Sequence, residues 1–196
     1  MSEKLIVMLL VLGAWVFWFI QAYNRLVALR NQFQNAFAQI DVQLKRRYEL
    51  IPNLVESAKG YMAHERGTLQ ALIAARNGAD TARQNAAEQP DNAKAVQALS
   101  QAESAMAATM GRFMALSEAY PDLKANQTIS QLMEELAATE NRIGFARQAF
   151  NDAVMFYNTA RQSFPSNLIA QRYAFAAAEL LHIDNSEERK PVRVVF

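Results

Sequence analysis

Charged and amide side chains that recur at helical spacing are the residues of this sequence best placed to do chemistry. They are Arg46, Arg47 and Glu49 in one segment, and Glu140, Arg147 and Asn151 in another. The second set lies in an apolar stripe, where an unpaired buried charge would cost several kcal/mol. We therefore expect Glu140 and Arg147 to meet opposite charges on the first segment. Such a network more often fixes helix register than it catalyses, and a functional surface is the alternative.

A spacing used by metal centres occurs once in the chain. Glu179 and His182 form an E-x-x-H pair, which would lie on one face of a helix. A di-iron site in a helical bundle requires a second such pair and a glutamate from each of two further helices. The other histidine is His64, with Tyr61 rather than a glutamate three residues before it. We therefore expect a solvated helix end at this pair and no metal site.

Motifs of the common catalytic classes are absent from the sequence. There is no cysteine, which excludes a disulfide framework, a thiolate zinc site and a cysteine nucleophile. There is also no H-E-x-x-H, no G-x-S-x-G and no glycine-rich phosphate loop. We predict that the protein is not an enzyme and that it has no catalytic residue, no metal ligand and no cofactor.

Methionines form a further candidate surface. They are Met106, Met110, Met114 and Met133. Flexible thioethers suit an adaptable peptide-binding face, although at helical spacing they more often fill gaps in a core. We favour the core interpretation, and a groove for a peptide is the alternative.

The elements that position these residues must be helices. The chain has 196 residues with only 6 glycines and 5 prolines, and it is rich in alanine and glutamine. Helix formers this abundant and turn formers this scarce predict an all-α fold. The net charge of +1 gives no basic footprint, so we expect no nucleic-acid partner.

An apolar segment near the N-terminus predicts a membrane span. No charged side chain occurs over 5–20, and residues to Tyr23 extend the run to the roughly 20 that a bilayer core requires. The run ends in aromatic residues rather than in the small residues of a signal-peptide cleavage site. We therefore predict an uncleaved transmembrane anchor over 1–22, with the lipid bilayer as a partner.

Apolar residues after the anchor follow the period of a straight helix. They are Leu26, Leu29, Phe33, Phe37, Ile40, Leu44, Tyr48, Ile51, Val55, Ala58 and Met62. The pattern predicts one long helix that bends at Pro52, because proline removes a backbone donor and crowds the preceding turn. The helix would continue past Met62 to a stop at 77–78. A connecting loop over 78–91 would follow, with Asp91 as the next N-cap.

Two further apolar stripes predict the remaining long helices. One stripe covers 96–116 and the other covers 129–164, where Pro165 ends it. A short alanine-rich helix over 166–181 would follow. Short connections make neighbouring helices antiparallel, which predicts a three- to four-helix bundle.

The bundle has predicted limits and a predicted core. It would cover 23–184, and the tail over 185–196 would be extended or disordered because of its proline and valines. In the core, side chains of the first long helix would pack against the last one. The expected contacts join Phe33, Phe37 and Ile40 to Ile143, Phe150 or Val154.

A nine-residue motif, RRYELIPNL at 46–54, carries a resemblance to the LemA family, in which RR-x-x-LIPNL precedes a helix and an Ala-Arg pair, here Ala75 and Arg76. The similarity begins at Tyr23 and continues through 140–167. Its motif residues include Pro52, Asn53, Glu140, Arg147, Asn151, Tyr157 and Asn158. Motifs this long in this order are specific to the family.

The resemblance implies a bacterial, single-pass inner-membrane protein with an N-terminal anchor and a soluble antiparallel helical bundle. It implies no established enzymatic activity, and some relatives are associated with membrane remodelling in organelle-forming bacteria. One segment departs from the family pattern. Relatives carry glycine and phenylalanine where this chain has QRYAFAAA at 171–178, and the alanines favour a longer terminal helix.

Two functions compete on this evidence. The first is a structural or assembly role at the bacterial inner membrane, through self-association that organises or shapes the membrane. The second is a membrane-tethered module that presents a helical groove to a peptide or partner protein. The flanking charges, Lys4 on one side and Arg25 and Arg30 on the other, differ little and favour a cytoplasmic C-terminal domain.

Overall fold

The computed structural model describes residues 3–182, and this part of the chain consists of helices and connecting segments without a strand. The four long helices are α1 (Glu3–Ala58), α2 (Arg66–Glu88), α3 (Ala93–Ser117) and α5 (Gln127–Gln162). Two short helices are α4 (Pro121–Ala125) and α6 (Ser166–Arg172). The predicted all-α fold is confirmed.

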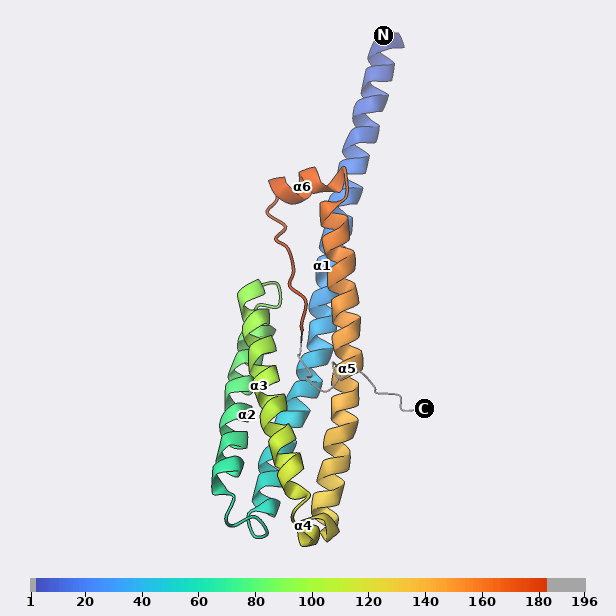
Figure 1. The fold of residues 1–196 in the computed structure, drawn as a ribbon. Coiled ribbons are helices and arrows are strands. Elements are labelled where there is room, and N and C mark those ends of the chain that lie inside the picture. Colours follow the sequence, from blue (N-terminus) through green and yellow to red (C-terminus); the bar gives the residue numbers. More distant parts are fainter. Residues whose placement is uncertain (1–2, 183–196) are drawn as a thin grey trace, which may run out of the picture.

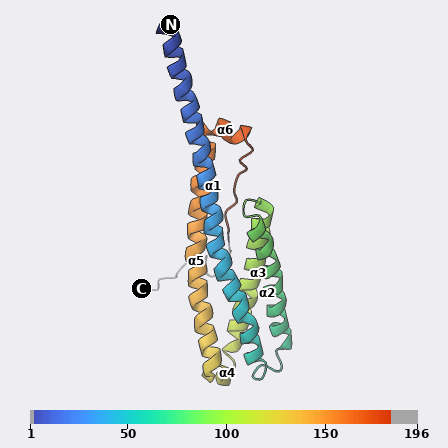
Figure 2. The same cartoon turned by 180° about the vertical axis from the view of Figure 1, so that it is seen from behind.

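The long helices alternate in direction and form two antiparallel pairs (Figure 1). α1 packs along α5, and α2 packs along α3. The α2–α3 hairpin covers only the half of the α1–α5 pair that lies far from the N-terminus, as Figure 1 and Figure 2 both show. The other half is completed by α6 and by an extended segment, 173–182, that runs back along α5.

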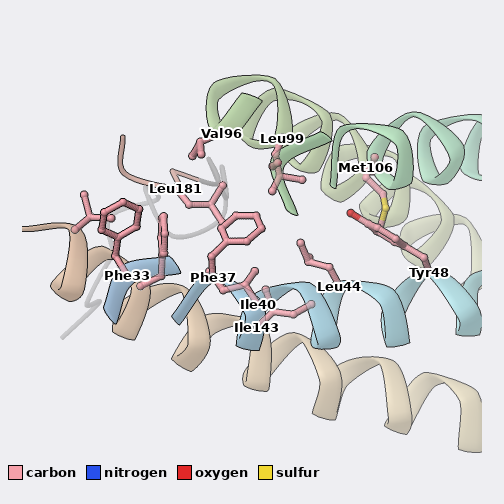
Figure 3. Close-up of a cluster of buried hydrophobic side chains, with 14 of the residues drawn as sticks. Phe33, Phe37, Ile40, Leu44, Tyr48, Val96, Leu99, Met106, Ile143 and Leu181 are labelled. Carbon is pink, nitrogen blue, oxygen red and sulfur yellow. The ribbon is translucent and has the colours of Figure 1, made fainter. Parts of the chain in front are cut away.

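Aromatic rings from α1 and α5 form the centre of the core (Figure 3). The ring centroids of Phe33 and Phe37 lie 6.4 Å and 5.5 Å from the centroid of Phe150. Ile40 and Ile143 are buried in the same cluster. The predicted packing of the first long helix against the last one is confirmed.

α1 leaves the bundle as a single helix towards the N-terminus (Figure 1). Side chains over 3–17 are all exposed, and α1 has an N-terminal part long and apolar enough to cross a membrane. The same helix continues without interruption through Pro52 to Ala58. The candidate span and the core-forming face therefore belong to one element.

The predicted loop over 78–91 is wrong, because α2 is helical through Glu88. Three residues at helical spacing, Ala79, Arg83 and Ala86, are buried where α2 packs along α3 and α1. Alanine is the best helix former, and its small side chain lets two helices approach closely. A search for large apolar residues does not detect such a stripe.

The turn between α1 and α2, residues 59–65, replaces the predicted continuation of the first helix. The backbone amides of Tyr61 and Met62 each donate to the Ala58 carbonyl at 3.0 Å. Met62 is nevertheless completely buried. The apolar stripe therefore indicated burial beyond the point where the helix ends.

The N-cap of α3 is Asn92 rather than the predicted Asp91. The Asn92 side chain accepts a hydrogen bond from the Lys94 backbone amide at 3.1 Å. Asp91 instead forms an ion pair with Arg30 of α1. The long-range partner explains why the local capping prediction was wrong.

The predicted helix over 166–181 is wrong beyond Arg172, where α6 ends. Ala174 has a φ of 53°, in the left-handed region that does not continue an α-helix. Glu179 and His182 then lie in the extended segment, so the E-x-x-H pair does not share a helical face.

Two further predictions concern the C-terminal part of the chain. Phe164 is 80% exposed and lies after the end of α5, so its predicted place in the apolar stripe is wrong. The cause is the helix end at Gln162, which leaves Phe164 outside the helical period. The predicted tail over 185–196 lies outside the described residues.

Candidate functional site

A buried ion network joins α1 to α3 and α5. Arg47 is 5% exposed and pairs with Glu103 of α3, which is completely buried. The Arg47 Nη1 donates to Glu140 of α5 at 2.7 Å, and the Tyr48 hydroxyl donates to the second oxygen of Glu103. Of the two candidate arginines, Arg46 and Arg47, Arg47 is the one that pairs with Glu140. One arginine and two carboxylates therefore join three helices and fix their register.

Burial and charge together set the protonation of this network. Burial acts to lower the pKa of the Arg47 guanidinium, but the carboxylates of Glu103 and Glu140 outweigh it and raise that pKa. Burial, followed by the nearby Glu103, raises the pKa of the Tyr48 phenol. Arg47 therefore stays charged and Tyr48 stays a neutral donor at neutral pH. These states suit a structural network and provide no free acid or base.

The rim of the network is exposed to solvent. Arg46 donates to Glu135 of α5 at 2.8 Å and lies 3.9 Å from Glu49 on its own helix. The Glu140 side chain is 51% exposed, so its predicted burial is wrong. The reason is that α3 makes no extensive contact with α5 and leaves this edge open. Exposed pairs of this kind stabilise a fold by about 1 kcal/mol or less.

A methionine-lined pocket opens beside the network, between α3 and α5. It has a volume of about 240 Å³. The walls are Met106, Ala107, Met110 and Met114 of α3 and Leu136, Ala137 and Glu140 of α5, with Arg47 beside them. Met106 is buried, whereas Met110, Met114 and Met133 are partly buried. The methionines therefore serve both as core and as a pocket wall.

Two asparagines of α5, the asparagine clamp, hold the extended segment by its backbone. The Asn151 side chain donates to the Leu181 carbonyl at 3.2 Å and accepts from the Leu181 amide at 2.9 Å. Asn158 makes the same pair of bonds with Ala178, at 2.8 Å and 3.1 Å. The asparagines are seven residues apart, so both face one side of the helix. Each amide satisfies the backbone donor and the backbone acceptor of one residue.

Two neighbours extend the contacts of the asparagine clamp. The Tyr157 hydroxyl donates to the Ala176 carbonyl, and Arg161 Nε donates to the Phe175 carbonyl, each at 2.8 Å. Side chains of the extended segment are buried at every third position, namely Phe175, Ala178 and Leu181. Three residues per turn is the repeat of a polyproline II helix, which has no internal hydrogen bonds. The side chains of α5 supply the hydrogen bonds that such a segment lacks.

The remaining motif residues make no buried centre. Pro52 and Asn53 lie on the exposed face of α1, where the Asn53 carbonyl accepts a hydrogen bond from Ser57 at 2.9 Å. Arg147 is half-buried on α5, one turn from Ile143. The motif therefore divides into two structural centres, the ion network and the asparagine clamp, and a set of peripheral positions.

Glu103 and Arg83 are buried charges that the sequence reasoning missed. Arg83 of α2 pairs with Asp41 of α1 at 2.5 Å and with Asp80 at 2.9 Å. Glu103 stands in the apolar stripe of α3 between positions 99 and 106, four residues after the first and three before the second. That 4+3 spacing was the signal that could have identified Glu103 as buried.

The fold and the two structural centres define the class of protein to which the chain belongs. Over residues 3–182 the chain is an antiparallel helical bundle whose central helix carries a candidate membrane span. Within that range no group of three or more histidine, cysteine, aspartate or glutamate residues could hold a metal ion. The chain belongs to the LemA family, whose family model matches residues 36–196.

Individual relatives are similar over most of the chain. Protein LemA of Metamycoplasma hominis is 27% identical over 189 residues, which cover 92% of this chain and 82% of the relative. Magnetosome protein MamQ of Magnetospirillum gryphiswaldense is 26% identical over 193 residues, covering 91% and 71%. Magnetosome protein MamQ 2 of Paramagnetospirillum magneticum is 25% identical over 190 residues, covering 89% and 70%.

Proposed function

We propose that this protein is a non-catalytic scaffold, anchored once in the bacterial inner membrane, that self-associates and organises or shapes that membrane. The observation that carries the proposal is α1, a single helix that contains both the candidate span and the core residues from Leu26 to Ala58. No loop separates the two parts, so the bundle is rigidly coupled to the anchor. The flanking charges favour a cytoplasmic bundle.

An apolar patch on α5 supports self-association. Phe145 is 75% exposed and Phe156 is 55% exposed, and three helical turns separate them, so they lie on one face. Met155, beside Phe156, is 53% exposed. Exposed apolar side chains grouped on one surface are typical of protein interfaces. The relatives named magnetosome proteins also support a role in a cellular assembly.

Light scattering of the full-length protein in detergent tests this proposal. We expect a homogeneous oligomer, and we expect Phe145→Ser combined with Phe156→Ser to shift it towards the monomer. The matched control is Val42→Ser, which changes an exposed apolar residue of α1 outside the patch. An unaltered chain that is monomeric at every concentration would contradict self-association.

A membrane-tethered binding module is the second candidate function. The methionine-lined pocket between α3 and α5 favours it, because adaptable side chains there lie beside the Arg47–Glu140 ion pair. A photo-crosslinking residue at Met110 tests this function against the first. A monomer that crosslinks one stoichiometric partner from Met110 supports the module. Crosslinks between copies from Phe145, with none from Met110, support the scaffold.

A further inference from the structure

Exposed apolar side chains surround the junction of α6 with α1. On α1, Trp15 is 61% exposed, and Trp18 and Phe19 are partly buried. Phe164 before α6, Leu168 on it and Tyr173 after it are 80%, 57% and 50% exposed. The two sets lie on elements that contact each other. They form one apolar surface at the end of the bundle from which the N-terminal part of α1 projects (Figure 1).

A cavity lies between the two elements. It has a volume of about 550 Å³. Its walls are Trp15, Trp18 and Phe19 of α1 and Phe164, Pro165, Leu168, Ile169 and Arg172 at α6. The Tyr173 ring packs against α1 next to these residues, with its centroid 5.9 Å from that of Phe19 and 5.3 Å from that of Tyr23. The cavity is apolar apart from one cation, Arg172.

The length of the charge-free stretch sets how deep α6 lies relative to a membrane. Between Lys4 and Arg25 there are about 20 residues without a charge, or about 30 Å of helix, which is the thickness of a bilayer core. The residues of α1 that line the cavity or touch Tyr173 begin at Trp15, within the last half of that stretch. A bilayer that covers the whole stretch therefore reaches α6.

The orientation of α6 matches that position. Figure 1 and Figure 2 both show α6 lying across the direction of α1, as a helix in the plane of the membrane would lie. Ile169 and Ala170 are buried against the bundle, whereas Leu168 and Arg172 are exposed. Apolar residues with a flanking cation are typical of interfacial segments, in which the arginine reaches the lipid phosphates.

We propose that Phe164, Leu168 and Tyr173 form an interfacial collar that inserts into the membrane crossed by α1, and that the cavity between α6 and α1 holds a phospholipid acyl chain. Arg172 contacts the phosphate of that lipid. The occupant is lipid because the surface is continuous with the candidate span. The inference rests on the proposed anchor, and it adds a second membrane contact that sets the depth and tilt of the bundle.

Single cysteines in this cysteine-free chain test the collar. The full-length protein is reconstituted in vesicles of phosphatidylcholine and phosphatidylglycerol, and each cysteine carries a fluorophore. Nitroxides attached near the lipid headgroups then quench the labels that lie at the membrane interface. We expect strong quenching at Phe164→Cys and Leu168→Cys. The matched control is Val42→Cys on α1, because Val42 is 58% exposed, close to the 57% of Leu168, and lies within the bundle away from α6; lipid nitroxides should not quench it.

A fourth label separates failure of the collar from failure of the anchor. Val11→Cys lies in the candidate span and should be quenched by nitroxides placed deep in the acyl chains. Quenching at Val11 without quenching at Phe164 and Leu168 would overturn the collar and leave the anchor standing. No lipid quenching at Val11 would overturn the anchor itself. Equal lipid quenching at Val42 and Leu168 would also overturn the collar, since the contact would then not be confined to α6.

Discussion

Glu103 is the fully buried carboxylate of the ion network and binds two neighbouring residues of α1. Its two oxygens accept from Arg47 and Tyr48, and Arg47 also binds Glu140. The Arg47 Nε is buried without a hydrogen-bond partner. Because Arg47 already lacks one hydrogen bond, it depends strongly on its ion pair with the buried Glu103.

Removal of Glu103 should therefore destabilise the bundle far more than removal of Glu140. Glu103→Ala leaves a buried guanidinium with one exposed partner, and we expect a loss of about 3 to 5 kcal/mol in the free energy of unfolding. Glu140→Ala should cost about 1 kcal/mol or less, because that side chain is half-exposed. Urea unfolding of both variants measures the difference.

A triple replacement provides the control for this comparison. Arg47→Met, Tyr48→Phe and Glu103→Leu together remove every polar group of the buried centre. If stranded charge is the cause, the triple variant should be less destabilised than Glu103→Ala. Equal losses for Glu103→Ala and Glu140→Ala would contradict the asymmetry that burial implies.

The Tyr48 phenol makes stability depend on alkaline pH. Burial and Glu103 raise its pKa in the folded state, so above about pH 10 the unfolded chain loses this proton first. The folded state then binds more protons, and the free energy of unfolding falls as pH rises, by up to about 1.4 kcal/mol per pH unit. Burial of Tyr157 acts in the same direction.

The variant Tyr48→Phe should separate these effects in urea titrations at several pH values. It should be less stable than the unaltered chain at neutral pH, because Glu103 loses a donor. It should also lose less stability between about pH 10 and 11. An unchanged slope over that range would show that Tyr48 ionises equally in both states.

Sequence reasoning reached part of the ion network. The charges in the α5 stripe predicted a partner on the first helix, and Arg47 supplies it. Glu103 was missed because a search for apolar periodicity passes over an acid at an apolar position. Which of several arginines an acid meets depends on how the helices rotate against each other, and local spacing does not determine that.

At the scale of elements, the extended segment 173–182 shows tertiary contacts overriding helix propensity. Its alanines favour a helix, yet the asparagine clamp binds its backbone and three side chains are buried at every third position. The segment replaces a fourth helix over the half of the bundle that the α2–α3 hairpin does not cover. The sequence analysis singled out both asparagines as motif residues, but local spacing does not identify the segment that they bind.

Loss of one amide of the clamp should release the segment locally. Asn158→Ala removes the two bonds to Ala178, and we expect a loss of about 1 to 3 kcal/mol with faster hydrogen exchange at the Ala178 amide. Asn141→Ala, an exposed asparagine on the same helix, is the matched control and should change neither quantity. Unchanged exchange at Ala178 in Asn158→Ala would mean that packing alone holds the segment.

α2 is a helix in a region that the sequence analysis predicted as a loop. Helix propensity over 78–88 was sufficient for a helix, but the scarcity of large apolar residues suggested a loop. Burial of Arg83 there depends on Asp41 of α1, a partner 42 residues away. Neither the small-residue packing nor that partner is visible in local spacing.

At the scale of the whole molecule, one helix links the candidate membrane span to the core. The long apolar stripe and the all-α composition were sufficient to predict this coupling. The division of the bundle into two helix pairs was not, because the apolar stripe continues past the end of α1 to the buried Met62, within the break at 59–65. The molecule is thus an elongated bundle with a candidate span at one end, and the half nearest the span is covered by α6 and the extended segment.

Anchoring through an intact α1 is the central claim, and the mass of the membrane-bound protein tests it most directly. Membranes containing the full-length chain are washed with alkaline carbonate, and the retained protein is weighed by intact-mass spectrometry. We predict that the chain stays in the membrane with its full mass of 22.0 kDa. Release of the protein into the wash would contradict the claim. So would the smaller mass of a chain cleaved after Ala14 or Ala22.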